Sequence, residues 1–437
     1  MSGAITTALA ATAGFFPLDD QLALWDGHWS EGLARDAVWL GGMAPSYGAA
    51  EAIWQRIGRT NISATSIWRR VQVWGAQFQA LADDARATAT ATPEVWTPPS
   101  RAEVSDQRMG VAMDGTTMYI LQEGWKEVKV GTVFEIAVGP TPDERTGEVV
   151  DLAHAVHDSY VAHLGGPEVL GELVWTEARR RGWEQAQDTE VLGDGAPWIW
   201  NQAALHFPAS HQLVDWCHGK QHLIAAGQAL KEPASLAYQR WLTSRETLLY
   251  QGQAARIAGE LAQAAGPPAT APAEVTPVTT PAANQEASAA AQPPVPATVT
   301  PAQAASATPP APTPATVTPA ATPAPTQKPP AAAQPPTPAT VTRTATPALS
   351  RPDVLRREAG YFEHNQHRMN YLEMREEEWP IGSGMVESAA KQYKARFCGP
   401  GMRWSRAGAE KLLPVRSAIL SHRFDDVWTQ VYNAPQN

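Results

Sequence analysis

A β-strand is predicted by the residues Gln107-Arg108-Met109-Gly110-Val111-Ala112-Met113-Asp114-Gly115. Apolar side chains at Met109, Val111 and Met113 alternate with small or polar residues, and this period of two is typical of an extended strand. The pattern predicts that the strand ends at Asp114, before a turn at Gly115. The Asp114 carboxylate is then expected to point away from the apolar face of the strand.

Further strand patterns and one helix pattern follow in an order that indicates a fold class. The predicted strands are 127–138, 149–155, 190–193 and 212–214, and the predicted helix is 167–181. Three antiparallel strands, a helix and two strands joined by a crossover are the order of an RNase H-like sheet. Helical patterns within 220–265 and 354–378 add an all-α insertion. The expected fold class is therefore α/β, with an RNase H-like mixed sheet that carries a helical insertion.

Composition favours a folded protein of a reducing compartment. The chain has 437 residues, of which 43% are apolar, and 17 tryptophans, which is enough for a large core. Its two cysteines, Cys217 and Cys398, lack the spacing of a zinc site or a disulfide framework, and Cys217 is expected in the core. The sequence indicates neither a signal peptide nor a membrane span. We therefore expect a cytoplasmic protein without a membrane partner.

The amino-terminal region shows the spacing of helices. A pattern that includes Ala50, Trp54 and Ile57 is followed by a predicted N-cap at Ser63 and a second helical pattern. Two short helices around a turn that contains glycine suggest a helix-turn-helix, and an ordinary αα-hairpin fits the pattern equally well. If the region binds DNA, four arginines are expected to contact phosphates: Arg56, Arg59, Arg69 and Arg70.

One long segment has the composition of a linker. Residues 267–350 consist almost entirely of Pro, Ala, Thr, Val and Gln, and the unit Pro-Ala-Thr-Val-Thr recurs within them. This composition predicts a disordered segment with some polyproline II structure. The segment either interrupts a domain whose two halves fold together or separates two independent domains. Such repeats also occur in secreted mucin-like stalks, but the lack of an export signal argues against that class.

A basic tail follows one glutamate near the carboxyl end. Glu387 opens a predicted helix within the stretch Trp379-Pro380-Ile381-Gly382-Ser383-Gly384-Met385-Val386-Glu387-Ser388. From Lys391 to Arg423 there are eight Lys or Arg residues and one acid, Glu410, in a chain of net charge -10. This arrangement favours a polyanion such as DNA as partner. Phosphate contacts are expected from Lys391, Lys394, Arg396, Arg403 and Arg406.

Carboxylates at the ends of separate strands suggest a metal site. Asp114, Asp194 and Asp215 each follow a predicted strand, and oxygen ligands of this kind suit a pair of Mg²⁺ ions about 4 Å apart. Each residue also has a simpler interpretation. Asp-Gly after a strand is commonly a turn, and Glu387 with Lys391 forms an ordinary i,i+4 pair on a helix.

Several ordered motifs resemble the signature blocks of DDE transposases from the Kra-type bacterial insertion sequences. The blocks begin at Met113, Gly124, Gly193, Asp215 and Ile381, and shorter motifs at 15–19 and 401–405 fit the same group. The resemblance implies an RNase H-like catalytic domain with a helical insertion before its glutamate. It also implies DNA cleavage and strand transfer with two ions of Mg²⁺ or Mn²⁺.

The resemblance also implies roles for individual residues. Asp114, Asp194 and Glu387 would be the catalytic metal ligands, and Asp215 and His218 would be accessory. The second acid is contested between Asp194 and Asp215, and Asp194 is preferred because in transposases with this insertion the second acid follows the fourth strand. Element ends and target DNA would be the partners, bound by a homo-oligomer associated with the bacterial nucleoid.

The predicted organisation has six segments, and two other functions stay open. A catalytically silent, transposase-derived DNA-binding protein and an RNase H-like nuclease are the alternatives to an active transposase. The segments are a helical DNA-binding region (1–100), the first part of the catalytic core (101–218), the insertion (219–266), the linker (267–350), the rest of the insertion (351–380) and the rest of the core (381–437).

Overall fold

A computed structural model describes residues 24–25, 29–91, 105–142, 147–233, 235–267 and 349–434. These residues belong to one compact unit. The motif at 15–19 and almost all of the predicted linker lie outside the described residues.

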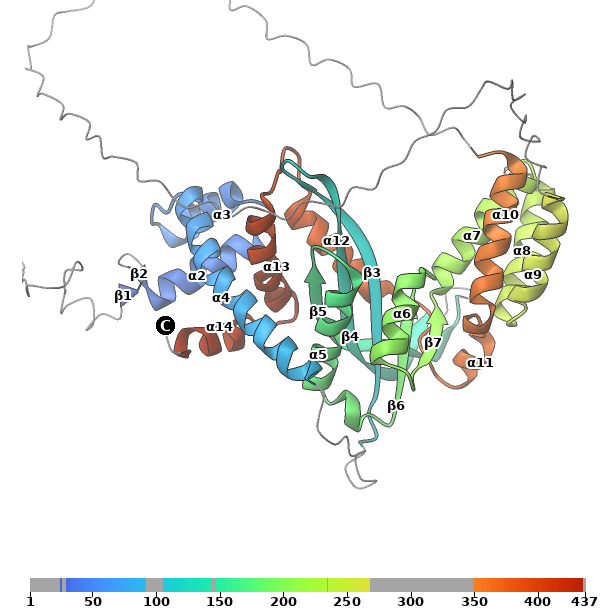
Figure 1. The fold of residues 1–437 in the computed structure, drawn as a ribbon, viewed down its shortest axis with the longest axis horizontal. Helices are drawn as coiled ribbons and strands as arrows, with labels where there is room; N and C mark the ends of the chain where they lie inside the picture. Colours follow the sequence, from blue (N-terminus) through green and yellow to red (C-terminus); the bar gives the residue numbers. More distant parts are fainter. Residues whose placement is uncertain are drawn as a thin grey trace, which may run out of the picture. The chain divides into compact units, whose positions relative to one another are not determined.

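A mixed five-stranded sheet forms the centre of the unit (Figure 1). The strands are β3 (Arg108–Ile120), β4 (Gly124–Pro142), β5 (Val149–His163), β6 (Asp188–Gly193) and β7 (His211–Val214). Their order is β5-β4-β3-β6-β7. The pairs β3–β4 and β4–β5 are antiparallel, whereas β3–β6 and β6–β7 are parallel. The predicted α/β class with a mixed sheet is confirmed.

The first predicted strand is longer than expected, because β3 continues six residues past Asp114 to Ile120. Thr116 pairs with Val128 and Ile120 with Gly124, so the turn of the β3–β4 hairpin follows Ile120 and not Asp114. The prediction that Asp114 closes its strand is therefore wrong. β-Branched and aromatic residues after Gly115 favour extended structure, and pairing with β4 outweighs the turn preference of Asp-Gly.

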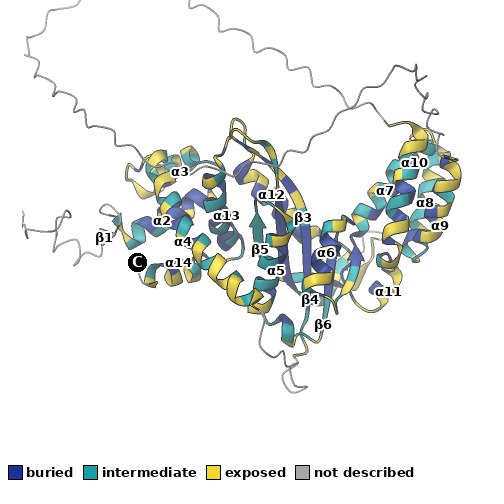
Figure 2. Ribbon diagram, in the orientation of Figure 1, coloured by how far each residue is buried: buried dark blue, intermediate teal, exposed yellow. Residues whose placement is uncertain are grey.

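The strands are buried on both faces near the centre of the sheet, as the dark blue segments of Figure 2 show. Met109 and Val111 point to one face of β3 and Ala112 to the other, and each is 0% exposed. Helices cover the sheet: α5 (Pro167–Arg180) packs on β4 and β5, and α12 (Gly384–Phe397) packs on β3. None of the helices in the described part of the chain combines the length and apolarity needed to cross a membrane.

Amino-terminal and carboxy-terminal helices pack together beside the sheet. The long helix α4 contacts α13 most extensively and also contacts α2, and Gly75 of α4 allows a close approach, since a Cβ there would lie 2.3 Å from the carbonyl oxygen of Lys411. This group consists of β1 (Leu24–Trp25), β2 (Trp29–Ser30), α2 (Glu31–Met43), α3 (Tyr47–Ile53), the π-helix η1 (Trp54–Gly58), α4 (Ala64–Thr90), α13 (Arg406–Leu420) and α14 (Phe424–Asn433).

The predicted helix-turn-helix region differs from the expected pair of short helices. Ser63 caps α4 as predicted, with its hydroxyl accepting a hydrogen bond from the amide of Ser66 at 3.1 Å. However, α4 has 27 residues, because its apolar face packs along α13. Ile57, placed on the apolar side of the first helix by its spacing, is 77% exposed.

A second group of helices combines segments from both sides of residues 268–348. The helix α10 packs against α7 and α9, and Arg351 donates a hydrogen bond to the carbonyl oxygen of Leu230 at 3.2 Å. The group consists of α7 (Trp216–Leu230), α8 (Leu236–Tyr250), α9 (Ala254–Ala265), α10 (Arg351–Asn365), the 3-10 helix η3 (Gln366–Arg368) and α11 (Tyr371–Glu376). Two further short elements, η2 (Trp183–Gln185) and α6 (Pro197–His206), flank β6.

Candidate active site at the ends of the parallel strands

Three aspartates follow equivalent positions in three neighbouring parallel strands. The register of β3, β6 and β7 places three residues opposite one another: Met113, Gly193 and Val214. Each of these three residues is followed directly in the chain by an aspartate: Asp114, Asp194 and Asp215. Residues in register on parallel strands lie side by side, so the sheet itself places these aspartates next to one another.

Asp114 lies half-buried among other ionisable groups. Its Oδ1 accepts a hydrogen bond from the amide of Gly115 at 2.6 Å. Burial raises the pKa of Asp114, and the carboxylates of Asp194 and Glu387 raise it further, while the Gly115 amide and His218 oppose the shift. Asp194 and Glu387 are therefore close enough to Asp114 to repel its charge, and a bound cation would relieve that repulsion.

The turn after β6 positions Asp194. Its Oδ1 accepts a hydrogen bond from the amide of Ala196 at 2.8 Å, and its carbonyl oxygen accepts one from the hydroxyl of Tyr361 at 2.8 Å. Gly195 has a φ of 98°, and a Cβ at this position would lie 2.7 Å from the Tyr361 ring. Both the backbone angle and the neighbouring ring thus require glycine next to Asp194.

Asp215 is buried and fully engaged in hydrogen bonds. It is 1% exposed and forms the N-cap of α7, where its Oδ1 accepts from the amide of His218 at 2.8 Å and from His218 Nδ1 at 3.0 Å. Its Oδ2 accepts from the amide of Ser383. Burial acts to raise the pKa of Asp215, but the hydrogen bonds from His218 and Ser383 lower it overall. The same bond to Asp215 raises the pKa of His218.

Glu387 reaches the site from the first turn of α12. Ser383 precedes this helix, and its bond to Asp215 ties the start of α12 to the start of α7. The Glu387 carboxylate also lies 3.5 Å from the ammonium of Lys391, so the expected i,i+4 pair is present. Because Lys391 is 77% exposed, this pair is weak and leaves Glu387 available for another ligand.

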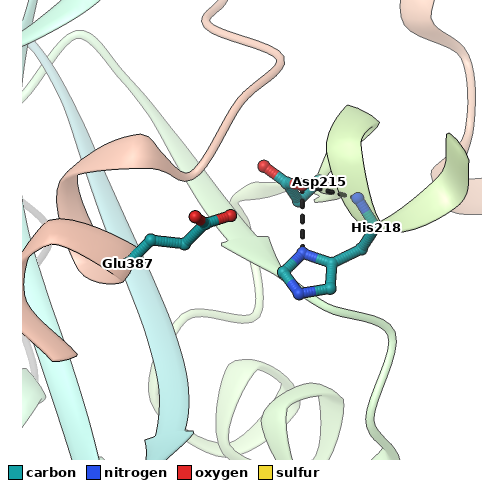
Figure 3. Close-up of side chains that lie close together, drawn as sticks. All are labelled: Asp215, His218 and Glu387. Atoms are coloured by element: carbon teal, nitrogen blue, oxygen red, sulfur yellow. Dashed lines mark hydrogen bonds and ion pairs between the residues drawn. The ribbon is translucent and has the colours of Figure 1, made fainter. Parts of the chain in front are cut away.

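Figure 3 shows Glu387 facing the hydrogen-bonded pair of Asp215 and His218. These three residues offer ligand atoms within 4.8 Å of one another. However, Asp215 is occupied by its own hydrogen bonds and orients His218, as outer partners of metal sites commonly do. Asp114, Asp194 and Glu387 are half-buried carboxylates, and oxygen ligands of this kind suit Mg²⁺ or Mn²⁺.

A cavity of about 460 Å³ opens beside Asp215 and Glu387, which both line it. Trp216, Tyr250 and Arg375 from the helical group line it as well. The ends of β4 and β5 contribute Thr141 and residues 152–155. The cavity is larger than metal ions alone require and has room for part of a substrate.

The basic residues expected to contact DNA do not form one open surface. Arg396 is 1% exposed, and its Nε and Nη2 both donate to the carbonyl oxygen of Gly41, at 3.0 and 2.9 Å. Its guanidinium also lies over the rings of Tyr47 and Trp404. The expectation of an exposed phosphate contact is therefore wrong for Arg396, because this side chain fixes the end of α2 against α12.

The other basic residues expected to contact DNA differ in their exposure and in their side-chain partners. Arg406 is engaged with Glu123 and Glu410, and Arg70 is half-buried with its guanidinium 5.2 Å from the ring of Trp29. Six of the residues expected to contact phosphates are exposed: Arg56, Arg59, Arg69, Lys391, Lys394 and Arg403. Phosphate contacts by these residues stay a prediction.

The site contains residues to which the sequence pattern gave no role. Tyr361 lies on α10, and nothing in its local sequence points to the backbone of Asp194. Ser383 stands inside the motif around Glu387, but only the fold shows that its amide binds Asp215. Cys217 is exposed, so its expected place in the core is wrong. The helix α7 begins at Trp216, which turns the adjacent Cys217 outward.

Comparison of the chain with protein-family models and with curated proteins gave no match.

Proposed function

We propose that this protein is a DDE transposase of the Kra-type group that cleaves DNA and transfers the cut strand. The observation that carries this proposal is the register of Met113 with Gly193, which sets Asp114 beside Asp194 on neighbouring strands. Glu387 joins them from α12, which packs on β3. Carboxylates gathered in this way suit a divalent-metal site for phosphoryl transfer.

The topology supports an RNase H-like core. If its five strands are numbered in chain order, their order across the sheet is third, second, first, fourth and fifth. The fourth and fifth strands run parallel to the first. The helical group between β7 and α12 occupies the place of an insertion before the glutamate. We infer that the basic residues near the amino and carboxyl ends serve DNA binding, that the protein acts as a homo-oligomer on paired element ends, and that it works in the cytoplasm at the nucleoid.

Each acidic residue has a distinct role in this proposal. Asp114, Asp194 and Glu387 would hold two Mg²⁺ or Mn²⁺ ions, which when bound activate water and polarise the phosphodiester. Asp215 keeps His218 oriented toward the site and joins α7 to the start of α12. Tyr361 and Gly195 fix the backbone that carries Asp194.

The test uses the purified full-length protein and a plasmid that carries the genomic sequences flanking its coding region. With Mg²⁺ or Mn²⁺ we expect cuts that leave 3′-hydroxyl ends, followed by joining to target DNA. Asp114→Asn, Asp194→Asn and Glu387→Gln should abolish both products while DNA binding persists. Glu363→Gln, which changes an exposed glutamate of α10, should behave as the wild type.

The same experiment separates the alternative functions. DNA binding without cleavage by the wild type would favour a silent DNA-binding protein. Cleavage of RNA–DNA hybrids without joining would favour an RNase H-like nuclease. Normal cleavage by Asp194→Asn would exclude Asp194 as the second metal ligand.

A further inference from the structure

Among the described residues, Arg375 is a cation without a partner in the cavity that Glu387 lines. It lies on α11 and lines the same cavity as Asp215 and Glu387. Its Nε is buried without a hydrogen-bond partner, and within the described chain its guanidinium forms neither a hydrogen bond nor an ion pair. Arg375 is also the only Lys or Arg among the described residues that line this cavity.

The position of Arg375 suits a substrate better than a structural role. A buried nitrogen without a partner destabilises the protein, and such groups commonly await a ligand or water. Arg375 does not neutralise Asp215 or Glu387, although all three border one cavity. An arginine in this place matches a phosphate next to the one at the metal ligands, because a guanidinium binds phosphate oxygens through several N–H groups.

Two aromatic side chains of the helical group also border the cavity. Trp216 and Tyr250 line it, and their ring centroids lie 5.7 Å apart in an edge arrangement. The same two residues line a second cavity of about 530 Å³, which also includes Lys220. Tyr371 also packs against Trp216 in an edge arrangement, with ring centroids 4.9 Å apart. The two cavities therefore share this aromatic pair as a wall, and together they are called the groove below.

We propose that this groove binds a single DNA strand next to the cleavage site, with Arg375 on a backbone phosphate and Trp216 and Tyr250 stacking against bases. Basic groups combined with aromatic platforms are the usual means of holding single strands. A duplex fits less well, because its bases are already stacked on each other. Placing this strand next to a cleavage site depends on the proposed function, whereas strand binding itself does not.

Binding can be measured without cleavage, using the full-length protein in EDTA and a fluorescein-labelled single-stranded oligonucleotide followed by anisotropy over a range of salt concentrations. For Arg375→Gln we expect weaker binding and a salt dependence reduced by about 0.7 in the log–log slope, the value for one lost phosphate contact on a single strand. For Trp216→Leu we expect about tenfold weaker binding with an unchanged slope, because stacking releases no counterions.

Two variants serve as controls. Arg240→Gln removes an exposed arginine of α8 that lines neither cavity and should bind as the wild type. Trp216→Phe keeps an aromatic face and should recover most of the affinity lost in Trp216→Leu, which separates stacking from misfolding. Unchanged affinity and salt dependence in Arg375→Gln, or an equal loss of affinity in Arg240→Gln, would contradict strand binding in the groove. A wild-type protein that binds the strand in this way but cuts no DNA would support the groove and refute the proposed function.

Discussion

The hydroxyl of Tyr361 binds the backbone of Asp194 across 167 positions of sequence, at a distance of 2.8 Å. The Tyr361 ring stacks on His222 with centroids 3.4 Å apart, and His222 in turn pairs with buried Glu358. The helical group thus positions one of the three proposed metal ligands, although none of its own side chains belongs to that set.

Tyr361→Phe should weaken metal binding more than it weakens the fold. The ring and its stacking remain, so we expect a loss of only about 1 kcal/mol in the free energy of unfolding for one hydrogen bond. Outer partners of metal ligands commonly change metal affinity about 10- to 100-fold. Titration of the variant with Mn²⁺, followed calorimetrically, should therefore give a dissociation constant raised at least about tenfold. Tyr119→Phe, which changes a 37% exposed tyrosine of β3, is the control. Equal metal affinity in both variants would contradict a positioning role for Tyr361.

Asp215→Asn should act mainly on stability, in contrast to Asp194→Asn. Asp215 accepts from Ser383 and from two nitrogens of His218, so the neutral amide loses charge-assisted bonds and places an NH₂ group where an acceptor is needed. We expect urea unfolding in EDTA to show a loss of about 2 kcal/mol for Asp215→Asn and less than about 1 kcal/mol for Asp194→Asn. DNA cleavage, measured below the unfolding range, should persist in Asp215→Asn and vanish in Asp194→Asn. The reverse result would make Asp215 the second metal ligand.

The sequence pattern predicted the sheet well because strand periodicity is local. The predicted starts or ends of β5, β6 and β7 agree closely with the structure, and the residues after Gly193 and Val214 are those expected at strand ends. The predicted end of β3 was wrong because its last residues pair with β4. The turn preference of a short sequence carries no information about such pairing.

The candidate site could be predicted only as a set of residue types. Asp114, Asp194 and Glu387 were proposed as metal ligands, and the preference for Asp194 over Asp215 rested on the family resemblance, since both residues follow a predicted strand. What separates them is burial and hydrogen bonding, which depend on Ser383 from a distant segment. The roles of Tyr361 and Arg396 were inaccessible for the same reason, because each depends on a partner far away in the chain.

Substitution of Arg396 should lower stability, whereas substitution of Arg403 should weaken DNA binding. Arg396→Ala leaves the carbonyl oxygen of Gly41 without its donor and opens space between Tyr47 and Trp404, so we expect a loss of about 2–4 kcal/mol in unfolding free energy. The salt dependence of duplex DNA binding by the folded variant should not change. Exposed Arg403→Ala should leave stability unchanged and lower the slope of that salt dependence by about 0.9, as for one lost duplex contact. A reduced slope in folded Arg396→Ala would show that its buried guanidinium does reach DNA.

Two buried glutamates should give stability opposite dependences on pH. Glu190 of β6 is 0% exposed, and neither of its carboxylate oxygens has a hydrogen-bond partner in the described chain. Burial raises the pKa of Glu190 well above its usual range, although the charge of Arg108 acts to lower it. Glu177 of α5 is also buried, but its ion pairs with Arg180 and Arg423 outweigh burial and lower its pKa.

A raised pKa in the folded state means that the folded protein binds the proton of Glu190 more tightly than the unfolded chain does. Each pH unit between the two pKa values then costs the fold up to about 1.4 kcal/mol as pH rises. Glu190→Gln removes this cost, so urea unfolding should show that the variant gains stability over the wild type as pH rises above the usual pKa of glutamate. The lowered pKa of Glu177 makes stability change with pH in the opposite direction. Its contribution is complete above the unfolded pKa and disappears as pH falls through the folded value, so Glu177→Gln should be less stable than the wild type at neutral pH and approach it in acid. A Glu190→Gln variant whose advantage does not grow with pH would show that Glu190 finds a partner or water in solution.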